Sequence, residues 1–320
     1  MKLHLSIDTE ADNLWNKTDE IHLNNLNAIP RFQQLCDDFS FPPTYLVTYP
    51  VANLPKGKDM LGDIVKSNRA EIGAHLHPWS CPPFESITSN DSFHHPCPHH
   101  LPIDLFRRKM ETLTAKIKES FGKYPVTYRG GRWGIIGSHL SILEELGYKV
   151  DTTVTPQISW KIIARASKGK NGINFSDAPL NPYYPSSENI CVPGESKILE
   201  IPLTVLSTRR PHLRKLFRTL VNSRLVIAAR RFGFGPQMLR PLPQVNKRIL
   251  KVFLETAIDM ELPQIHMMTH SSELMYPFSP YNRTAMDTEK LYSKLHYFFS
   301  ICEEAGLKGG TLGEYNHSSE

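Results

Sequence analysis

The feature that most constrains this chain is a regular alternation of short apolar segments with longer amphipathic ones. Seven short segments have the character of β-strands, at residues 2–8, 44–48, 71–75, 126–129, 148–152, 198–204 and 264–270. Helical patterns lie between most of them, at residues 23–38, 58–67, 103–121, 138–146, 212–231, 245–259 and 287–305. Such alternation predicts βαβ units and a mainly parallel sheet. The strand number fits a closed or nearly closed barrel, and a doubly wound open sheet is the alternative.

The composition fits one ordinary globular domain. Of the 320 residues, 40% are hydrophobic and 22% are charged. Because α/β barrels often reach this length as one domain, we predict a single domain over residues 1–320. For the last helix we predict Asp287 as the N-cap and Gly306 as the end.

The sequence predicts a cytoplasmic protein with reduced thiols. No stretch of about 18 apolar residues indicates a membrane-spanning helix. Asp8 falls where a secretory signal would be apolar. The five cysteines are odd in number and include no C-x-x-C pair, which does not suit a disulfide framework.

Polar residues end the first and last predicted strands. Leu3, Leu5 and Ile7 share one face of the first strand, and Asp8 ends the other face. His270 ends the last strand. Active sites of parallel barrels and open α/β sheets lie at the carboxyl ends of the strands. We therefore expect chemistry at this end of the sheet.

Two pairs of metal-competent residues have i, i+2 spacing near strand ends. The carboxylates of Asp8 and Glu10 would repel each other unless a cation or a proton lay between them. An extended backbone points His75 and His77 the same way, with Cα atoms about 7 Å apart. Two histidines and one carboxylate are a common catalytic zinc set. The alternatives are solvated acids in a loop and histidines that cap a strand.

Other polar segments have less specific patterns. Residues 129–134 are rich in glycine, which suits either a ligand-binding turn or an ordinary one. Asp151 ends the next strand and is the expected partner of Arg129. A lone terminal histidine such as His270 is more often structural than catalytic. For the histidine-rich residues 94–100 we expect adventitious metal binding or a loop over the active site, because no partner cysteine lies at a zinc-finger distance.

Positive charge is concentrated in the later part of the chain. Between Glu200 and Glu255 there are twelve Lys or Arg residues and no Asp or Glu. We interpret residues 207–251 as a basic helical excursion that attracts anionic partners. One interpretation is a solvated helical face. The other is a helix on an anionic bilayer, at the inner face of the membrane. We expect no nucleic acid partner, because no binding module is present.

Taken in order, the strand-end motifs resemble those of the polysaccharide deacetylase superfamily, the NodB-homology group. Members have a distorted (β/α)7-type barrel and hydrolyse N-acetyl groups on sugars with a divalent metal, usually zinc. The segments that begin at His75 and at His270 look like a divergent branch found among lipopolysaccharide and O-antigen biosynthesis proteins.

The resemblance implies roles for the motif residues. Asp8 matches the catalytic base, and His270 matches the general acid. Arg129 matches the residue that orients the base, and Asp151 matches the acid that pairs with this arginine. These four residues are the expected catalytic set.

The resemblance also implies one divalent metal ion, Zn2+, bound by this chain. Glu10 and His75 match the metal-binding acid and the first histidine. His77 is our choice for the second histidine, although the family usually has it at i+4, where this chain has Trp79. Gly131 replaces a usual proline, and Arg132 replaces a usual aromatic residue whose backbone N–H is the expected oxyanion donor. The expected substrate contacts are Arg132, Trp133, Ser271, Ser272 and Glu273.

The implied function is metal-dependent removal of an acetyl or formyl group from an amino sugar. A nucleotide-linked or lipid-linked glycan would suit the basic segment. One alternative is a metal-independent glycoside hydrolase that uses two carboxylates. The other is a non-catalytic glycan- or lipid-binding protein with a decayed site.

Overall fold

The computed structural model describes residues 1–12, 20–161, 172–207 and 235–315. The chain forms two compact units that are interleaved in the sequence. The first unit comprises Met1–His75, Lys116–Tyr124 and Arg240–Glu320, and the second comprises Leu76–Ala115 and Pro125–Leu239. The predicted helix at 212–231, and with it most of the basic segment 207–251, lies outside the described residues. The single domain over residues 1–320 stays a prediction.

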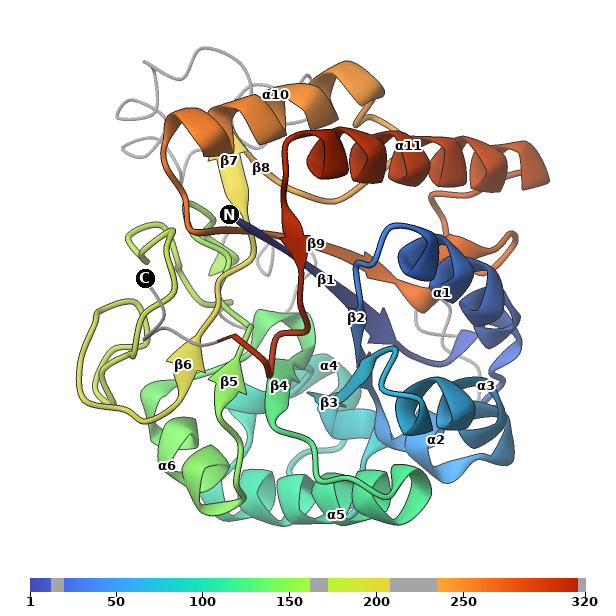
Figure 1. The fold of residues 1–320 in the computed structure, drawn as a ribbon. Helices are drawn as coiled ribbons and strands as arrows, with labels where there is room; N and C mark the ends of the chain where they lie inside the picture. Colours follow the sequence, from blue (N-terminus) through green and yellow to red (C-terminus); the bar gives the residue numbers. More distant parts are fainter. Residues whose placement is uncertain (13–19, 162–171, 208–234, 316–320) are drawn as a thin grey trace. The chain divides into compact units, whose positions relative to one another are not determined.

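The first unit is built on parallel strands. They are β1 (Lys2–Thr9), β2 (Pro43–Val47), β3 (Glu71–Leu76), β9 (Gln264–His270) and β10 (Lys308–Gly309). Their order is β10-β1-β2-β3, and β9 also pairs with β1. Figure 1 labels β1, β2, β3 and β9. The register of β1 and β9 aligns Asp8 with His270. The carboxyl ends of these two strands therefore meet.

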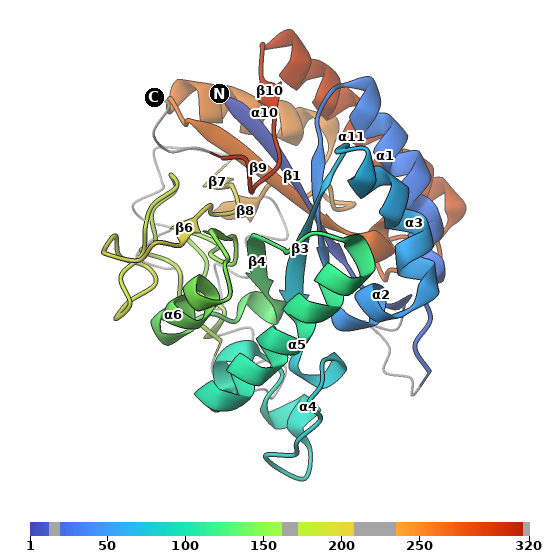
Figure 2. The same ribbon diagram turned by 60° about the horizontal axis from the view of Figure 1, so that its bottom comes forward.

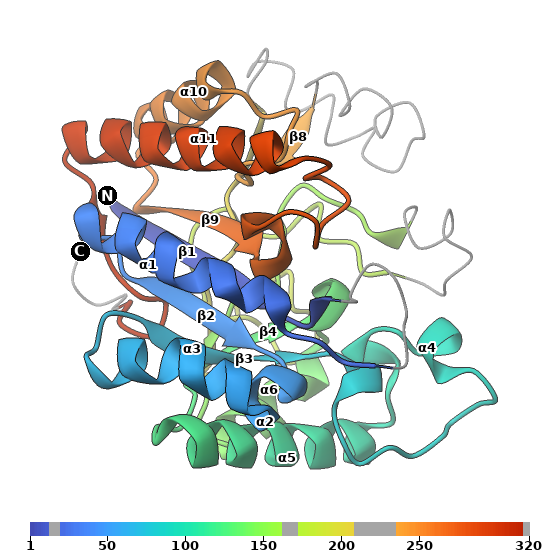
Figure 3. The ribbon, with the colours of Figure 1, turned by 90° about the vertical axis from the view of Figure 1, so that its right-hand side faces the viewer.

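Amphipathic helices cover this sheet. They are α1 (Ile29–Asp38), α2 (Tyr49–Asn53), α3 (Pro55–Lys66), α10 (Lys247–Asp259) and α11 (Ala285–Glu304). Figure 3 shows α1, α3 and α11 along one side of β1, β2 and β9. Leu3, Leu5 and Ile7 are at most 2% exposed, so the apolar face of β1 forms core as its alternation predicts. Among the described residues, no helix is both long and apolar enough to cross a membrane.

The start of α11 corrects one prediction. The N-cap is Thr284, not Asp287. The Thr284 side chain accepts a hydrogen bond from the Asp287 amide, and the Asp287 carboxylate accepts one from the Thr284 amide. This reciprocal capping box places Asp287 at the third helical position. The helix ends as predicted, before Gly306, whose φ of 76° suits glycine.

The second unit contains shorter strands. They are β4 (Thr127–Gly130), β5 (Val150–Asp151) and β6 (Leu199–Glu200), which are parallel, and β7 (Val205–Ser207) and β8 (Pro236–Met238), which are antiparallel. The helices α4 (Asp91–His94) and α6 (Gly137–Glu145) belong to this unit, and α5 (Ile103–Phe121) begins in it (Figure 2). Glu144 of α6 accepts a hydrogen bond of 2.7 Å from the Lys197 amide just before β6.

The strand predicted at 198–204 is much shorter in the structure, where only Leu199–Glu200 pair as β6. Pro202 explains part of this difference, because proline has no amide hydrogen to donate to a neighbouring strand. The chain resumes pairing at Val205, in a different sheet.

Candidate active site

Asp8 and His270 lie next to each other at the ends of β1 and β9. Asp8 Oδ2 is 3.8 Å from His270 Nε2. The two residues are 3% and 9% exposed, so both side chains are largely shielded from water. The residues that the sequence predicts as base and acid are therefore neighbours on paired strands.

Glu10, His75 and His77 form a buried group of metal-competent side chains. His75 Nε2 lies 2.8 Å from Glu10 Oε1 and 3.8 Å from Asp8 Oδ2. The backbone stays extended through His77, with φ −106° and ψ 122°. One ligand atom from each of the three residues lies within 4.8 Å of the others. Two imidazoles and a carboxylate at such distances are a donor set that fits zinc.

Two neighbours pack closely against His77. A Cβ atom at Gly131 would overlap Nδ1 of His77 and the carbonyl oxygen of Leu76, so only glycine allows this approach. Trp79, at the usual place of the second histidine, packs on His77 with ring centroids 4.3 Å apart. Arg132 lies over the Trp79 ring at 5.0 Å. Trp79 therefore supports the ring of His77.

His270 is held by a buried ion-pair network. Its Nδ1 lies 3.0 Å from Glu273 Oε1, and Arg240 forms an ion pair with the same carboxylate. Thr269 Oγ1 donates a 2.9 Å hydrogen bond to Glu273 Oε2. Burial acts to raise the pKa of Glu273, but electrostatic interactions and hydrogen bonds with Arg240 and His270 outweigh it and lower this pKa to about 2. Glu273 is therefore ionised at neutral pH.

Arg240 was not among the predicted site residues. Its Nη2 atom lies 2.9 Å from His270 Nδ1, and it is only 7% exposed. In the sequence it is one of twelve basic residues in a stretch without Asp or Glu, and no local pattern distinguishes it from the others. Only the tertiary contact with Glu273 identifies it.

The three residues after His270 are buried. They belong to the 3-10 helix η7 (Ser271–Leu274), in which Ser271 and Ser272 are 0% exposed. Ser271 Oγ accepts a 3.1 Å hydrogen bond from the Glu10 amide, which ties η7 to the end of β1. In this structure Ser271 and Glu273 support the site residues, and their contact with substrate stays a prediction.

Arg129 and Asp151 lie together in the second unit. Arg129 is fully buried, and its Nε donates a 3.0 Å hydrogen bond to the Thr152 carbonyl. Thr153 Oγ1 donates a 2.6 Å hydrogen bond to Asp151 Oδ1. Burial raises the pKa of Asp151, and the charge of Arg129 acts in the opposite direction, while the direct pairing of the two side chains stays a prediction. The role of Arg129 towards Asp8 stays a prediction.

Glu200 is a second buried acid beside Asp151. The two residues are aligned across β5 and β6, and their carboxyl groups share a hydrogen bond. Burial raises the pKa of both groups, and the charge of Asp151 helps to raise the pKa of Glu200 well above its usual value. Glu200 therefore holds its proton to a higher pH than an exposed glutamate does. The strand-end rule that identified Asp151 would also have found Glu200.

The turn after β4 carries Arg132 and Trp133. Both have positive φ angles, 53° and 59°, which are uncommon outside glycine. Arg132 is exposed and Trp133 is half-buried. The Trp133 ring stacks on Trp160, with centroids 5.7 Å apart. The contact of Arg132 and Trp133 with a substrate stays a prediction.

Comparison with known proteins gives matches in structure only, since no family model and no curated protein matches the sequence. A candidate polysaccharide deacetylase from Mycobacterium smegmatis is 14% identical, with a TM-score of 0.50 over 98% of this chain and 95% of its own. A candidate glycoside hydrolase/deacetylase from Parabacteroides distasonis is 13% identical, with a TM-score of 0.61 over 98% of this chain and 69% of its own. A 4-alpha-glucanotransferase from Thermococcus litoralis is 13% identical, with a TM-score of 0.51 over 98% of this chain and 40% of its own.

At these identities the likeness shows the fold. It confirms the predicted class, a parallel α/β fold of the distorted (β/α)7 type found in structures named polysaccharide deacetylases. The glucanotransferase shares this fold, so the fold by itself does not define the reaction. The reaction has to be argued from the side chains.

Proposed function

We propose that this protein is a metal-dependent hydrolase that removes an acetyl or formyl group from the nitrogen of an amino sugar. The observation that carries the proposal is the buried group of Asp8, Glu10, His75 and His270 at the carboxyl ends of β1, β3 and β9. Active sites of parallel barrels lie at this end of the strands. Two structures with this fold are named as candidate deacetylases, which supports the proposal.

Glu10, His75 and His77 would hold the divalent cation, for which zinc is the best fit. Such an ion would polarise the acyl carbonyl group and lower the pKa of a water molecule. The donor set supports zinc, because two imidazole nitrogens and one carboxylate oxygen are typical of catalytic zinc sites.

Asp8 and His270 would carry the proton transfers. Asp8 accepts a proton from the attacking water, and His270 delivers one to the departing sugar amine. Because the ionised Glu273 lies 3.0 Å from His270 Nδ1, it stabilises the positively charged imidazolium that donates this proton. Arg240 in turn keeps Glu273 ionised and in place. Arg129 and Asp151 complete the proposed catalytic set.

The substrate we propose is a nucleotide-linked or lipid-linked glycan of lipopolysaccharide or O-antigen biosynthesis. The motif forms at His75 and His270 support this class, as does the basic segment 207–251. Trp133 and Trp160 offer a partly accessible aromatic surface of the kind that sugar rings pack against. Action in the cytoplasm, at the inner face of an anionic membrane, is part of the same proposal.

A metal-independent glycoside hydrolase is the second candidate. The shared fold with a 4-alpha-glucanotransferase favours it. Against it, Asp8 and Glu10 both approach the same nitrogen of His75, at 3.8 and 2.8 Å. Two acids gathered around one imidazole suit a shared cation better than the two sides of a glycosidic bond.

The proposal is tested by separating metal binding from catalysis. Asp8→Asn should retain its metal and lose at least about 100-fold in acetate or formate release, because general base catalysis contributes about 10²–10⁴-fold. His75→Ala should lose both metal and activity. Asp59→Asn, at an exposed position of α3, is the matched control and should behave as wild type. An Asp8→Asn variant that remains fully active would rule out the assignment of the base.

A further inference from the structure

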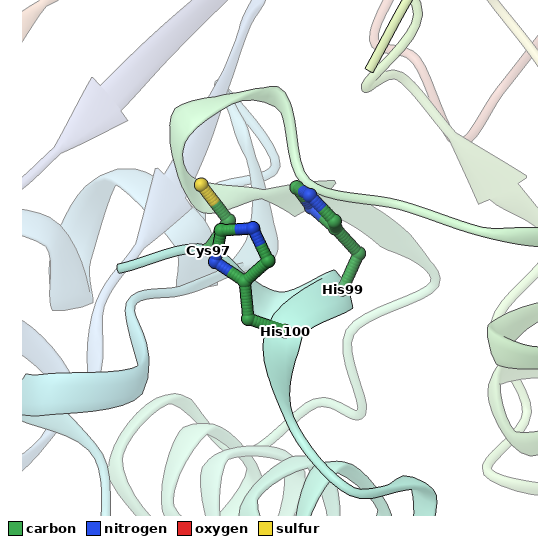
Figure 4. A group of neighbouring side chains, drawn as sticks. All are labelled: Cys97, His99 and His100. Carbon is green, nitrogen blue, oxygen red and sulfur yellow. The ribbon is translucent and has the colours of Figure 1, made fainter. Parts of the chain in front are cut away.

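A second group of metal-competent side chains lies in the second unit. Cys97 Sγ and one ring nitrogen from each of His99 and His100 all lie within 4.8 Å of one another. The three side chains come from one short stretch around the 3-10 helix η4 (Pro98–His100), as Figure 4 shows. The two imidazole rings are adjacent, with centroids 4.1 Å apart. Cys97 is 7% exposed, and both histidines are half-buried, which leaves a route for an ion to enter.

The backbone of this turn gathers the donors. The His100 amide donates a 3.0 Å hydrogen bond to the Cys97 carbonyl, and the Leu101 amide donates one of 3.1 Å to the Pro98 carbonyl. Cys97 is the N-cap of η4, with an extended backbone (φ −117°, ψ 147°). The backbone hydrogen bond between Cys97 and His100 holds the two residues in one turn. In addition, His95 Nδ1 lies 3.2 Å from the His100 carbonyl oxygen.

The turn packs tightly against the end of the segment that carries Arg132 and Trp133. A Cβ atom at Gly134 would lie 2.6 Å from Pro98 Cδ, 3.0 Å from Cys97 Cβ and 3.0 Å from His99 Nδ1. The 97–100 turn thus rests directly on the Gly134 backbone. Anything that fixes this turn also limits the movement of the neighbouring segment.

We propose that Cys97, His99 and His100 form a second zinc site, separate from the one proposed at Glu10, His75 and His77. One thiolate and two imidazoles are ligands that zinc prefers, and they suit magnesium and calcium poorly. On binding, the Cys97 thiol releases its proton to solvent and forms the sulfur–zinc bond. The ion fixes the 97–100 turn against Gly134, and a water molecule occupies its fourth position. This inference does not depend on the proposed deacylase activity.

Cobalt distinguishes the two sites, because only this one contains sulfur. Purified protein stripped of metal and loaded with Co2+ should show thiolate-to-cobalt charge-transfer absorption in the near ultraviolet. The absorption should persist in His75→Ala and disappear in Cys97→Ser, a nearly isosteric change. Cys191→Ser is the matched control, since Cys191 is a half-buried free cysteine outside the proposed site, and it should keep the absorption.

Zinc stoichiometry gives an independent count. Wild type should bind one more zinc ion than Cys97→Ser. Loss of a residue that only hydrogen-bonds to a metal ligand weakens metal binding by about 10–100-fold. Because His100 is a proposed direct ligand, His100→Gln should weaken Co2+ binding by more than this. Circular dichroism checks that the variants are folded. If Cys97→Ser does not fold, His100→Gln takes its place as the test variant. Absence of the charge-transfer absorption in wild type, or its persistence in folded Cys97→Ser and His100→Gln, would overturn the proposal.

Discussion

Each of the two units buries carboxyl groups beside an arginine, but the pKa of the acid is lowered in one unit and raised in the other. The ionised cluster consists of Arg240, His270 and Glu273, and the proton-sharing cluster consists of Arg129, Asp151 and Glu200. In the first, the pKa of Glu273 falls to about 2. In the second, the pKa of Glu200 rises well above its usual value. Both acids are at most 3% exposed, so burial by itself does not decide their charge.

The balance of charges explains the difference. In the ionised cluster one carboxylate faces an arginine and a histidine, so its negative charge is compensated. In the proton-sharing cluster two buried carboxyl groups face each other with a single arginine nearby, so ionisation of both is disfavoured and the pKa of each is raised. The first arrangement suits the stabilisation of a charged acid catalyst. The second arrangement joins the ends of two strands and avoids burying two negative charges side by side.

The largest expected effect comes from removing the cation of the ionised cluster. Arg240→Met leaves Glu273 charged and buried without its main partner, which should lower the free energy of unfolding by about 3–5 kcal/mol. Activity should fall by at least about 100-fold, because His270 loses its oriented partner. Urea denaturation and kcat/KM measure the two effects.

The control for Arg240→Met is Arg31→Met. Arg31 pairs with Glu289 at the surface, where both side chains are at least 50% exposed. Exposed pairs contribute about 0–1 kcal/mol, so this variant should be close to wild type. Equal stability losses in the two variants would mean that the buried network has no special role.

The next effect concerns the pH dependence of Glu273. Its pKa is lowered from 4.5 to about 2, so ionisation stabilises the folded state by about 3 kcal/mol at neutral pH. This stability is present above the unfolded pKa and is lost as the pH falls through the folded pKa. The stability difference between wild type and Glu273→Gln should therefore shrink from pH 4.5 towards pH 2. A difference that stays constant over this range would contradict the assignment.

The smallest expected effect is at Glu200. Below the unfolded pKa the Glu200 carboxyl group is neutral in the folded and the unfolded state, so there Glu200→Gln replaces one neutral group with another and should change the free energy of unfolding by about 1 kcal/mol or less. The pH trend has the opposite sign to that of Glu273. Since the folded pKa is raised, wild-type stability falls as the pH rises above the unfolded pKa, and the variant should lack this fall. Urea denaturation at acidic and alkaline pH would show it.

Strand-end logic located much of the candidate site from the sequence. The alternation in residues 2–8 and the terminal position of His270 identified two side chains that the register of β1 and β9 aligns. The i, i+2 spacing of His75 and His77 predicts that both reach one ion with Glu10, and ligand atoms of the three residues lie within 4.8 Å of one another, while their binding of an ion stays a prediction. Both inferences depend on period-2 geometry and on the shared end of parallel strands, which are local properties.

Other features depend on contacts that a linear pattern does not contain. Arg240 matters because it meets Glu273, which lies 33 residues further along the chain. The N-cap of α11 could not be decided by residue type, because Thr284 and Asp287 are both good capping residues. The strand β10 pairs at only two positions and is too short for any periodicity to show.

The central claim is that a cation held by Glu10, His75 and His77 is needed to remove an acyl group from a sugar. The most direct measurement is mass spectrometry of the products formed from N-acetylated and N-formylated amino-sugar glycans. Protein stripped of metal should be inactive. Added zinc should restore activity to wild type but not to His75→Ala or His77→Ala. The products should have lost the acyl group and kept their glycosidic bonds. Full turnover by the stripped protein, or cleavage of the glycosidic bond, would contradict the account.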